Sequence, residues 1–309
     1  MEEILAKELL ADRRKDRRWR NIRWVGWMII LILFLIIFLL AAGVGSNHKS
    51  EIGAGQPYVA LIRLTGIIMP ETDFSAEKVV PQLNEAFTDN NAKGVVLIIN
   101  SPGGSPVQAS IIHDKIVALK QKYKKKVIVV GEDALASGSY LVATAADKIY
   151  VNNDTLTGSI GVIMEGFGAN DAIAKIGIQR RVFTAGANKD RLDPFQPLKP
   201  EDVAKVKTVL DQVHQSFIND VLTGRQGKLK GDQKELFSGD FWSGQQAVQL
   251  GLADDTLNLW DAMEKEFNTR YYKDYSVKPS FLQELLGNVG TELHLNFSQQ
   301  FNKHLDASI

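Results

Sequence analysis

The sequence predicts an α/β domain that follows a hydrophobic N-terminal helix. Short runs rich in Val and Ile, such as 94–99, alternate along the chain with longer segments in which apolar residues recur at helical spacing. Strands that alternate with helices in this way favour a largely parallel sheet that is buried on both faces. Before this pattern begins, Trp24 to Val44 form a run of 21 residues without a charge.

The uncharged run at 24–44 is predicted to be a transmembrane anchor. At a rise of 1.5 Å per residue it would span about 30 Å, the thickness of the hydrocarbon core. The chain is strongly basic before the run and has only Lys49 between the run and Arg63; the preceding basic residues are Lys7, Arg13, Arg14, Lys15, Arg17, Arg18, Arg20 and Arg23. The positive-inside rule then predicts residues 1–23 in the cytoplasm and the rest of the chain on the periplasmic side of the inner membrane. A cleaved signal peptide is the alternative, although its apolar region is typically shorter.

The segments after the anchor have the following predicted boundaries. Residues 45–56 are small and polar and are expected to form a tether, 57–270 the folded domain, and 271–309 a tail that packs on a neighbouring subunit or is mobile. Strands are expected at 58–64, 94–100, 127–130, 148–151, 160–164 and 178–184. Helices are expected at 75–90, 106–123, 137–146, 171–176, 200–224, 243–250 and 260–267.

Composition excludes several classes of function. The chain has no Cys, which excludes thiol nucleophiles, disulfides and Cys-based zinc sites. Its formal net charge of +0 gives no support for nucleic-acid binding. The 5 His residues are scattered and form no metal-ligand motif, so neither a metal nor another cofactor is expected.

A turn of small residues at 136–139, A-S-G-S, brings Ser137 to the start of an apolar helix. The free amides and the dipole at a helix start favour a negative charge, so Ser137 is the candidate nucleophile. Gly104, in N-S-P-G-G-S at 100–105, can expose an amide between a strand and a helix, and it is expected to form an oxyanion hole with the Gly138 amide. An ordinary N-cap serine and a simple tight turn are the alternatives.

Lys189, in G-A-N-K-D, is the candidate general base. No His occurs between His113 and His214, so no imidazole close downstream of Ser137 can serve. A lysine acts as a base where burial removes its proton, and a solvated loop lysine is the alternative. Ser159, in L-T-G-S-I-G-V, is expected to orient the amine. Together these residues predict a membrane-anchored serine protease with a Ser–Lys dyad.

Several motifs in the same order resemble the signal peptide peptidase A (SppA) family in its short, single-domain bacterial form. They are I-I-N-S-P-G-G-S at 98–105, A-S-G-S-Y at 136–140, A-T-A-A-D-K-I-Y at 143–150, T-L-T-G-S-I-G-V-I-M-E at 155–165 and G-A-N-K-D at 186–190. The resemblance implies a Clp protease/crotonase-like fold of ββα units, with Ser137 as the nucleophile, Lys189 as the general base and Ser159 orienting the lysine. Ser139 departs from the family, where a second Gly is common.

The resemblance also implies a biological role. Such enzymes degrade signal peptides left in the membrane, and the short forms assemble into a homo-oligomeric ring or dome in which Ser and Lys can come from adjacent subunits. Two alternatives are a crotonase-like acyl-CoA enzyme, which also uses paired amides, and a non-enzymatic membrane scaffold. A peptidase of the same group that trims other membrane proteins is a third.

Overall fold

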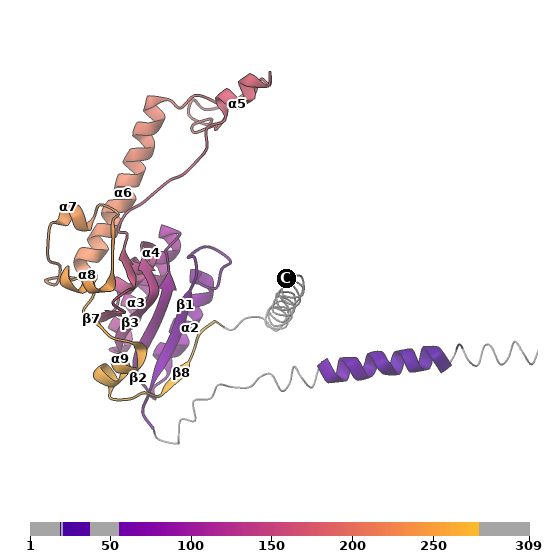
Figure 1. Cartoon of the computed structure of the whole chain (residues 1–309), viewed down its shortest axis with the longest axis vertical. Helices are drawn as coiled ribbons and strands as arrows, with labels where there is room; N and C mark the ends of the chain where they lie inside the picture. The colour runs from indigo at the N-terminus through magenta and orange to yellow at the C-terminus, as the bar shows by residue number, and fades with distance from the viewer. Residues whose placement is uncertain (1–18, 20, 38–55, 278–309) are drawn as a thin grey trace, which may run out of the picture. The chain divides into compact units, whose positions relative to one another are not determined.

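The computed structural model describes residue 19, residues 21–37 and residues 56–277 (Figure 1). The chain divides into two units, and the α/β domain lies in the second, Ser50–Val277. Each unit is described by itself.

In the first unit, residues 21–37 form a helix with exposed apolar side chains. The predicted anchor lies partly in this helix, while residues 38–44 of the anchor, residues 45–55 of the tether and residues 278–309 of the tail lie outside the described residues. Among the residues that the structure describes, no helix combines the length and the apolar character needed to cross a bilayer. The anchor stays a prediction.

The α/β domain alternates strands and helices, as the sequence predicts. Its elements are β1 (Tyr58–Thr65), α2 (Ala76–Thr88), β2 (Ala92–Ser101), α3 (Pro106–Tyr123), β3 (Lys126–Ala136), α4 (Gly138–Thr144), β4 (Lys148–Val151), β5 (Leu156–Gly158), α5 (Asn170–Lys175), α6 (Pro200–Gly224), α7 (Gln233–Leu236), β6 (Phe241–Trp242), α8 (Gly244–Gln249), β7 (Asp255–Thr256), α9 (Leu259–Phe267) and β8 (Tyr272–Asp274).

A single sheet in the order β6-β5-β3-β2-β1-β8 organises the domain. Its pairs are parallel, except for the antiparallel pair of β5 and β6. β3 is long enough to pair twice on one side, first with β4 and then, nearer its C-terminal end, with β5. This second pairing places the residue that follows β3, Ser137, beside the end of β5.

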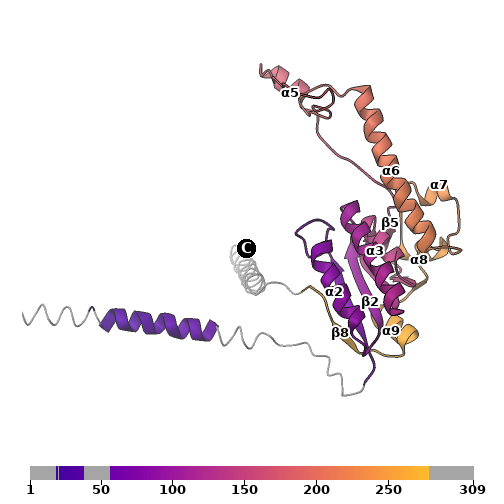
Figure 2. The ribbon, with the colours of Figure 1, turned by 180° about the vertical axis from the view of Figure 1, so that it is seen from behind.

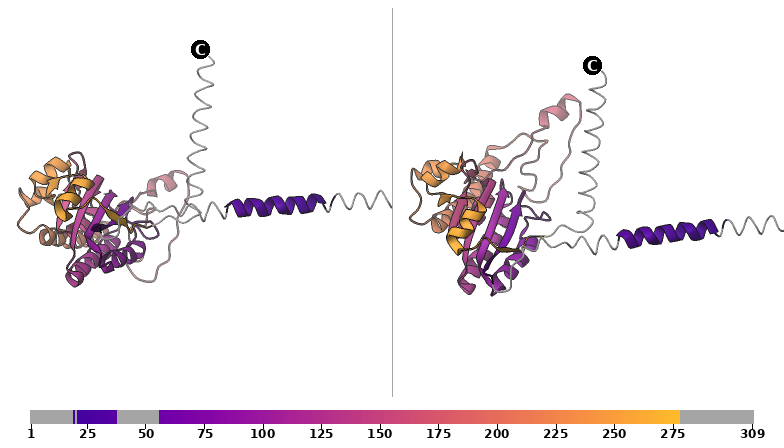
Figure 3. Two further views of the ribbon diagram at one scale, coloured as in Figure 1. Left: turned by 90° about the horizontal axis from the view of Figure 1, so that it is seen from below. Right: turned by 60° about the horizontal axis from the view of Figure 1, so that its bottom comes forward.

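The central strands are buried on both faces, which explains why they appear as continuous apolar runs in the sequence. Ile62 of β1, Leu97 of β2 and Val129 of β3 pack toward α2, α3 and α4 in the larger core. The alternate residues, such as Leu61 and Ile128, pack toward α9 in a smaller core. Figure 2 shows α2 and α3 covering one face, and Figure 3 turns the sheet so that its layers can be followed.

A long excursion, defined here as the arm (residues 163–199), joins the sheet to α6. It contains only the short helix α5, and Figure 1 shows it reaching beyond the sheet together with the N-terminal half of α6. Large apolar side chains of the arm are exposed, with Phe167 and Phe183 both 94% accessible. α6 is buried only near its C-terminal half, through Phe217 and Val221, apart from Asp202 near its start.

Two of the expected strands are wrong. Residues 160–164 and 178–184 are irregular, because no strand of this chain lies beside them and β-branched residues form a strand only where they can pair and pack. The sheet also continues past the predicted domain boundary at residue 270, since β8 pairs with β1 and Tyr275 is buried. The other expected strands and helices are confirmed to within a few residues, except that β3 extends beyond 127–130 to Ala136.

A carboxylate at the end of α2 ties β8 to the domain. Asp89 accepts hydrogen bonds from the hydroxyl groups of Tyr58, at 2.7 Å, and Tyr275. Burial by itself would raise the pKa of Asp89, but the hydrogen bonds from the two tyrosines outweigh it and lower the pKa to about 2. Because the pKa is lower in the folded state, this carboxylate stabilises the domain above its unfolded pKa, near 4, and the contribution is lost as the pH falls toward 2.

We therefore expect Asp89→Asn to lower the free energy of unfolding by about 2 kcal/mol at pH 6, and the difference from the wild type to shrink between pH 4 and pH 2. Urea unfolding at several pH values measures this. Asp154→Asn, at an exposed position, is the control and should change little at any pH. A difference for Asp89→Asn that does not depend on pH would contradict this account of the cluster.

Candidate active site

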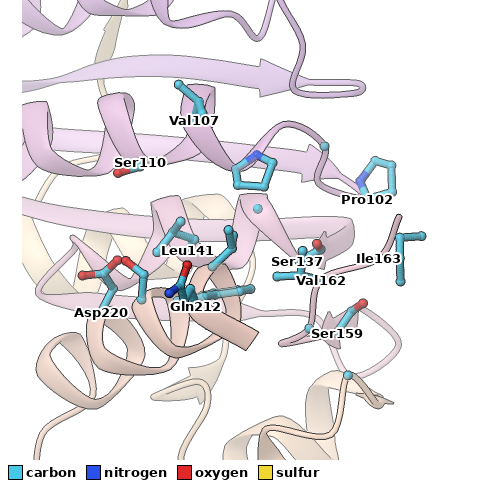
Figure 4. A pocket seen from close by; sticks show the side chains of 18 of the residues that line it. Pro102, Val107, Ser110, Ser137, Leu141, Ser159, Val162, Ile163, Gln212 and Asp220 are labelled. Carbon is cyan, nitrogen blue, oxygen red and sulfur yellow. The ribbon is translucent and has the colours of Figure 1, made fainter. Parts of the chain in front are cut away.

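A groove of about 960 Å³ opens between α3, α6 and the start of α4. Its lining includes Ser137, Gly138, Gly104 and Ser159, so four of the five predicted site residues meet at one place. Figure 4 shows the Ser137 and Ser159 side chains at the same end of the groove. The sequence separates these residues by as much as 55 positions, from Gly104 to Ser159, and the sheet brings them together.

The backbone of Ser137 adopts an unusual conformation, with φ 54° and ψ −127°. A non-glycine residue with positive φ is strained, and such strain persists only where the surrounding structure enforces it. Here the Ser137 amide donates to the Gly158 carbonyl at 2.8 Å, and the Ser137 carbonyl accepts from Leu141 in the first turn of α4. The sharp bend between β3 and α4 therefore presents the side chain to the groove.

Ser137 is not an ordinary N-cap. A capping serine accepts a hydrogen bond from an amide in the first turn of its helix, and Ser137 makes no such side-chain bond. Within residues 56–277, no hydrogen bond occupies its hydroxyl. The hydroxyl is thus available to a substrate in the groove.

Two amides lie beside the Ser137 side chain. Ile68 pairs with the segment around Gly104 through the Gly103 carbonyl and the Ser105 amide, which leaves the Gly104 amide itself outside the pairing. Gly138 is the first residue of α4, so its amide has no partner within the helix. A Cβ placed on Gly138 would lie 3.4 Å from the Gly104 nitrogen, which shows how closely the two segments approach. This arrangement has the form that an oxyanion hole requires.

Gly103 supports the bend from the opposite side. Its φ is +101°, and a Cβ there would lie 2.7 Å from the Ser137 Cβ and 2.8 Å from the Gly138 amide nitrogen. Any side chain at this position would therefore push against the turn that carries Ser137. The sequence showed Gly103 only as the neighbour of Gly104 in N-S-P-G-G-S and gave no sign of its contact with Ser137.

The contacts of Ser139 explain why a serine fits at this position, where a second glycine is common in the family. Its hydroxyl is fully buried and donates to the carbonyls of Ser101 and Ala136, at 2.8 Å each. The bond to Ser101 ties the turn to the end of β2. A second glycine could not make this link, so the serine here strengthens the turn rather than distorting it.

Ser159 also has a left-handed backbone, with φ 49°. Its amide donates to the Asp240 carbonyl at 2.7 Å, and the next residue, Ile160, offers its carbonyl to His214 Nε2 of α6 at 3.0 Å. These contacts hold the Ser159 segment between β6 and α6. His214 is a positioning contact that the sequence alone did not reveal.

Lys189 lies outside the groove. It is exposed in the arm, and Figure 1 shows that this segment extends away from the sheet on which Ser137 is placed. The loop around it is nevertheless organised: Arg191 bonds to Asp202 of α6 at 2.6 Å and to the Asn188 side chain at 2.9 Å. One copy of the chain therefore assembles the serine, the second hydroxyl and the amides, but does not bring the predicted base to them.

The polar residues that α6 contributes to the groove were also missed. Gln212, Ser216 and Asp220 line it at intervals of four residues, beside Val213 and Phe217. Sequence reasoning treated α6 only as an amphipathic helix with a packing face. A polar stripe at i, i+4 and i+8 next to that face was the available signal.

The chain is similar to several known proteins. The family model for Peptidase family S49 matches residues 119–270, and the model for Clp protease matches residues 55–155. "Putative protease slr0021" of Synechocystis sp. is 31% identical over 196 residues, which cover 63% of this chain and 68% of that protein. "Putative signal peptide peptidase SppA" of Enterococcus faecium is 28% identical over 232 residues, which cover 71% of this chain and 67% of that protein.

The chain belongs to peptidase family S49, a family of serine proteases. The Clp protease match is consistent with the mixed α/β fold of ClpP/crotonase type that the sequence predicts. Membership in S49 also favours the protease expectation over a crotonase-like acyl-CoA enzyme and over a scaffold without activity.

Another relative shows that similar segments occur in longer proteins. "Na(+)/H(+) antiporter NhaA" of Brucella melitensis is 40% identical over 245 residues, which cover 78% of this S49 chain but 32% of that protein. The chain thus spans about a third of the length of the Brucella relatives it matches. The name antiporter belongs to that longer protein.

The contact between Gly103 and the Ser137 turn can be tested in this S49 chain. We expect Gly103→Ala to reduce kcat/KM for peptide cleavage by about 100-fold or more, because a shift of about 1 Å in a reacting group is enough to do so. A fluorogenic peptide assay measures the rate, and thermal unfolding reports whether the fold persists.

Gly227→Ala is the matched control for this test. Gly227 has a positive φ of +71° but open space around a Cβ, so it carries the backbone strain without the contact to Ser137. Equal losses of activity in the two variants would show that strain alone, and not displacement of the turn, is responsible.

Proposed function

We propose that this chain is a membrane-anchored serine endopeptidase that degrades remnant signal peptides and similar hydrophobic segments, with Ser137 as nucleophile and Lys189 as general base. The observation that carries the proposal is the strained Ser137 turn, which opens onto a partly apolar groove beside two amides without helical partners. Membership in S49 supports the reaction class, and the Enterococcus relative named as a signal peptide peptidase supports the substrate class.

The chemistry follows from the placement of these groups. The amine of Lys189 takes the proton of the Ser137 hydroxyl as Oγ attacks the scissile carbonyl. The amides of Gly104 and Gly138 stabilise the negative charge that develops on the carbonyl oxygen. Lys189 then protonates the leaving amine and later activates the water that releases the acyl group, while Ser159 orients the amine.

The proposal takes Lys189 from a second copy of the chain. The arm that carries Lys189 exposes Phe167, Phe183 and Ile176, the last at 69% accessibility, and such a surface is typical of an interface that is covered in an assembly. A ring or dome of identical subunits would cover the arm and place each Lys189 beside the Ser137 of a neighbour. Burial in that interface would also supply the environment in which a lysine loses its proton.

We expect Ser137→Ala and Lys189→Ala each to abolish peptide cleavage without unfolding the protein. Co-expression of the two variants tests the shared site. If Ser and Lys come from adjacent subunits, random co-assembly leaves about a quarter of the sites with both groups and restores about a quarter of the wild-type activity.

The control for co-expression is the mixture of either variant with itself, which should remain inactive. Mixed assemblies that form, as judged by two affinity tags, and yet stay silent would argue that both groups act within one chain. A Ser137→Ala variant with full activity would remove the serine from the chemistry and overturn the proposal.

The N-terminal segment supports the proposed location. Residues 21–37 form a helix of mainly apolar, exposed residues, and the uncharged run continues to Val44. The basic residues before the run support a cytoplasmic N-terminus and a periplasmic protease domain, anchored by a single pass through the inner membrane.

The location has its own test. We expect the full chain to stay with the membrane fraction after washing at high pH, which strips peripheral proteins, and a variant without residues 1–45 to appear in the soluble fraction. Immunoblotting of the fractions measures both. Release of the full chain by the wash would contradict an integral anchor.

A further inference from the structure

The groove continues past Ser137, and its two ends differ in chemistry. Figure 4 shows Ser137 and Ser159 at one end and Ser110 and Asp220 at the other, with Leu141 and Gln212 between them. All six residues line the groove. The far end, which the reaction itself does not use, is defined here as the inner subsite.

The walls that lead to the inner subsite are apolar. Val107 and Ile111 of α3 remain 65% and 45% accessible, although they face a groove rather than a flat surface. Leu141 of α4 and Phe217 of α6 complete this part of the lining. Such walls suit an aliphatic chain, either a wholly apolar side chain or the methylene stem of a longer one.

The end of the inner subsite is polar and carries a negative charge. Gln212, Ser216 and Asp220 follow one another at intervals of four residues on the same face of α6. From Gln212 to Asp220 the helix rises about 12 Å, which corresponds to three or four residues of an extended peptide. The groove is therefore long enough to take side chains from several positions of a bound peptide.

Within residues 56–277, no lysine or arginine forms a salt bridge with Asp220. Across the same residues, its side chain takes part in no salt bridge or hydrogen bond, and the charges that act on it come from His113 and Asp114 of α3. The His113 imidazole is itself engaged by Asp114, with 3.0 Å between Nδ1 and Oδ1. Burial raises the pKa of Asp220, His113 opposes this effect, and the negative charge of Asp114 adds to it.

A cation that enters the groove would stabilise the negative charge of the Asp220 carboxylate. A neutral ligand would leave its charge partly desolvated and unpaired, whereas an ammonium or guanidinium group would pair with it and donate a further hydrogen bond to Ser216, one turn away. The apolar walls would at the same time pack against the methylene stem of the same side chain. Lysine and arginine are the peptide side chains that combine these two features.

We propose that the inner subsite binds a lysine or arginine side chain of the peptide substrate, with the Asp220 carboxylate as its counter-charge. The substrate class is then an apolar segment with a basic residue close to the scissile bond, rather than an apolar segment alone. This inference rests on the proposed function, since it assigns the groove to the peptide that Ser137 cleaves.

A set of matched peptides tests the proposal on the full chain in detergent. Each peptide is apolar and carries one lysine, which is moved through the four positions on either side of the scissile bond, and each has a partner with norleucine in place of that lysine. Norleucine has a straight aliphatic side chain without the amine, so a pair differs in the charge and not in the apolar contacts. At one position we expect lysine to raise kcat/KM about fivefold or more over norleucine.

Substitutions of Asp220 then assign the preference to its carboxylate. Asp220→Asn should remove the preference for lysine, so that the lysine and norleucine peptides of each pair are cleaved at similar rates, and Asp220→Lys should favour a glutamate peptide over a lysine peptide. Asp211→Asn is the matched control, because Asp211 is an exposed carboxylate on the same helix that does not line the groove. It should keep the preference of the wild type.

Binding separates this inference from the proposed function. In Ser137→Ala protein, fluorescence anisotropy of the same labelled peptides should show the lysine preference, and Ser137→Ala/Asp220→Asn protein should lack it. Wild-type protein that binds with this preference but cleaves none of the peptides would overturn the proposed function and support the subsite. Equal binding of lysine and norleucine peptides at every position, or a lysine preference that survives Asp220→Asn, would overturn the subsite even where cleavage is normal.

Discussion

The strained backbone of Ser137 is the constraint on which the candidate active site depends. A positive φ at a serine costs free energy, and contacts from the surrounding segments stabilise Ser137 in this conformation. The Gly158 carbonyl accepts from its amide, the buried hydroxyl of Ser139 ties the turn to β2, and Gly103 leaves room where any Cβ would collide. The contacts come from the ends of two strands, β2 and β5, which lie on either side of β3, so the turn depends on the pairing of the parallel sheet.

The same sheet explains why the two candidate oxyanion donors lie where they do. β2 and β3 are parallel neighbours, and the carboxyl ends of parallel strands meet at one edge. The loop after β2 brings Gly104 to that edge, and the turn after β3 brings Gly138. Because both segments are anchored in the sheet, their amides are oriented before a substrate arrives, which is the condition under which such donors accelerate a reaction.

The arm, unlike the turns at the sheet edge, is not anchored in the sheet. It exposes large apolar side chains and carries Lys189 away from the groove, yet the Arg191–Asp202 pair gives its loop a defined conformation. An ordered loop with an exposed apolar surface is costly in an isolated chain. A second subunit that covers this surface would account for both the cost and the distance between Lys189 and Ser137, and the completed site would then depend on assembly.

The sequence by itself determined the α/β class, most of the strands and helices, and the identity of four residues that the structure brings to one groove. These features depend on local patterns: apolar runs between glycines, helical spacing, and small residues at strand-to-helix turns. The expected strands at 160–164 and 178–184 failed for the corresponding reason, since an apolar run forms a strand only where another strand lies beside it.

Only the tertiary structure decided how these residues meet. The support of the Ser137 turn by Gly103 and Ser139, the bond from His214 to Ile160, and the polar stripe of α6 in the groove all join segments far apart in the sequence. The contact between Asp89 and Tyr275, which attaches β8 and extends the domain past residue 270, also joins distant segments. Sequence spacing carries no information on such contacts, because their distances are set by the packing of the sheet and its helices and not by the chain that connects them.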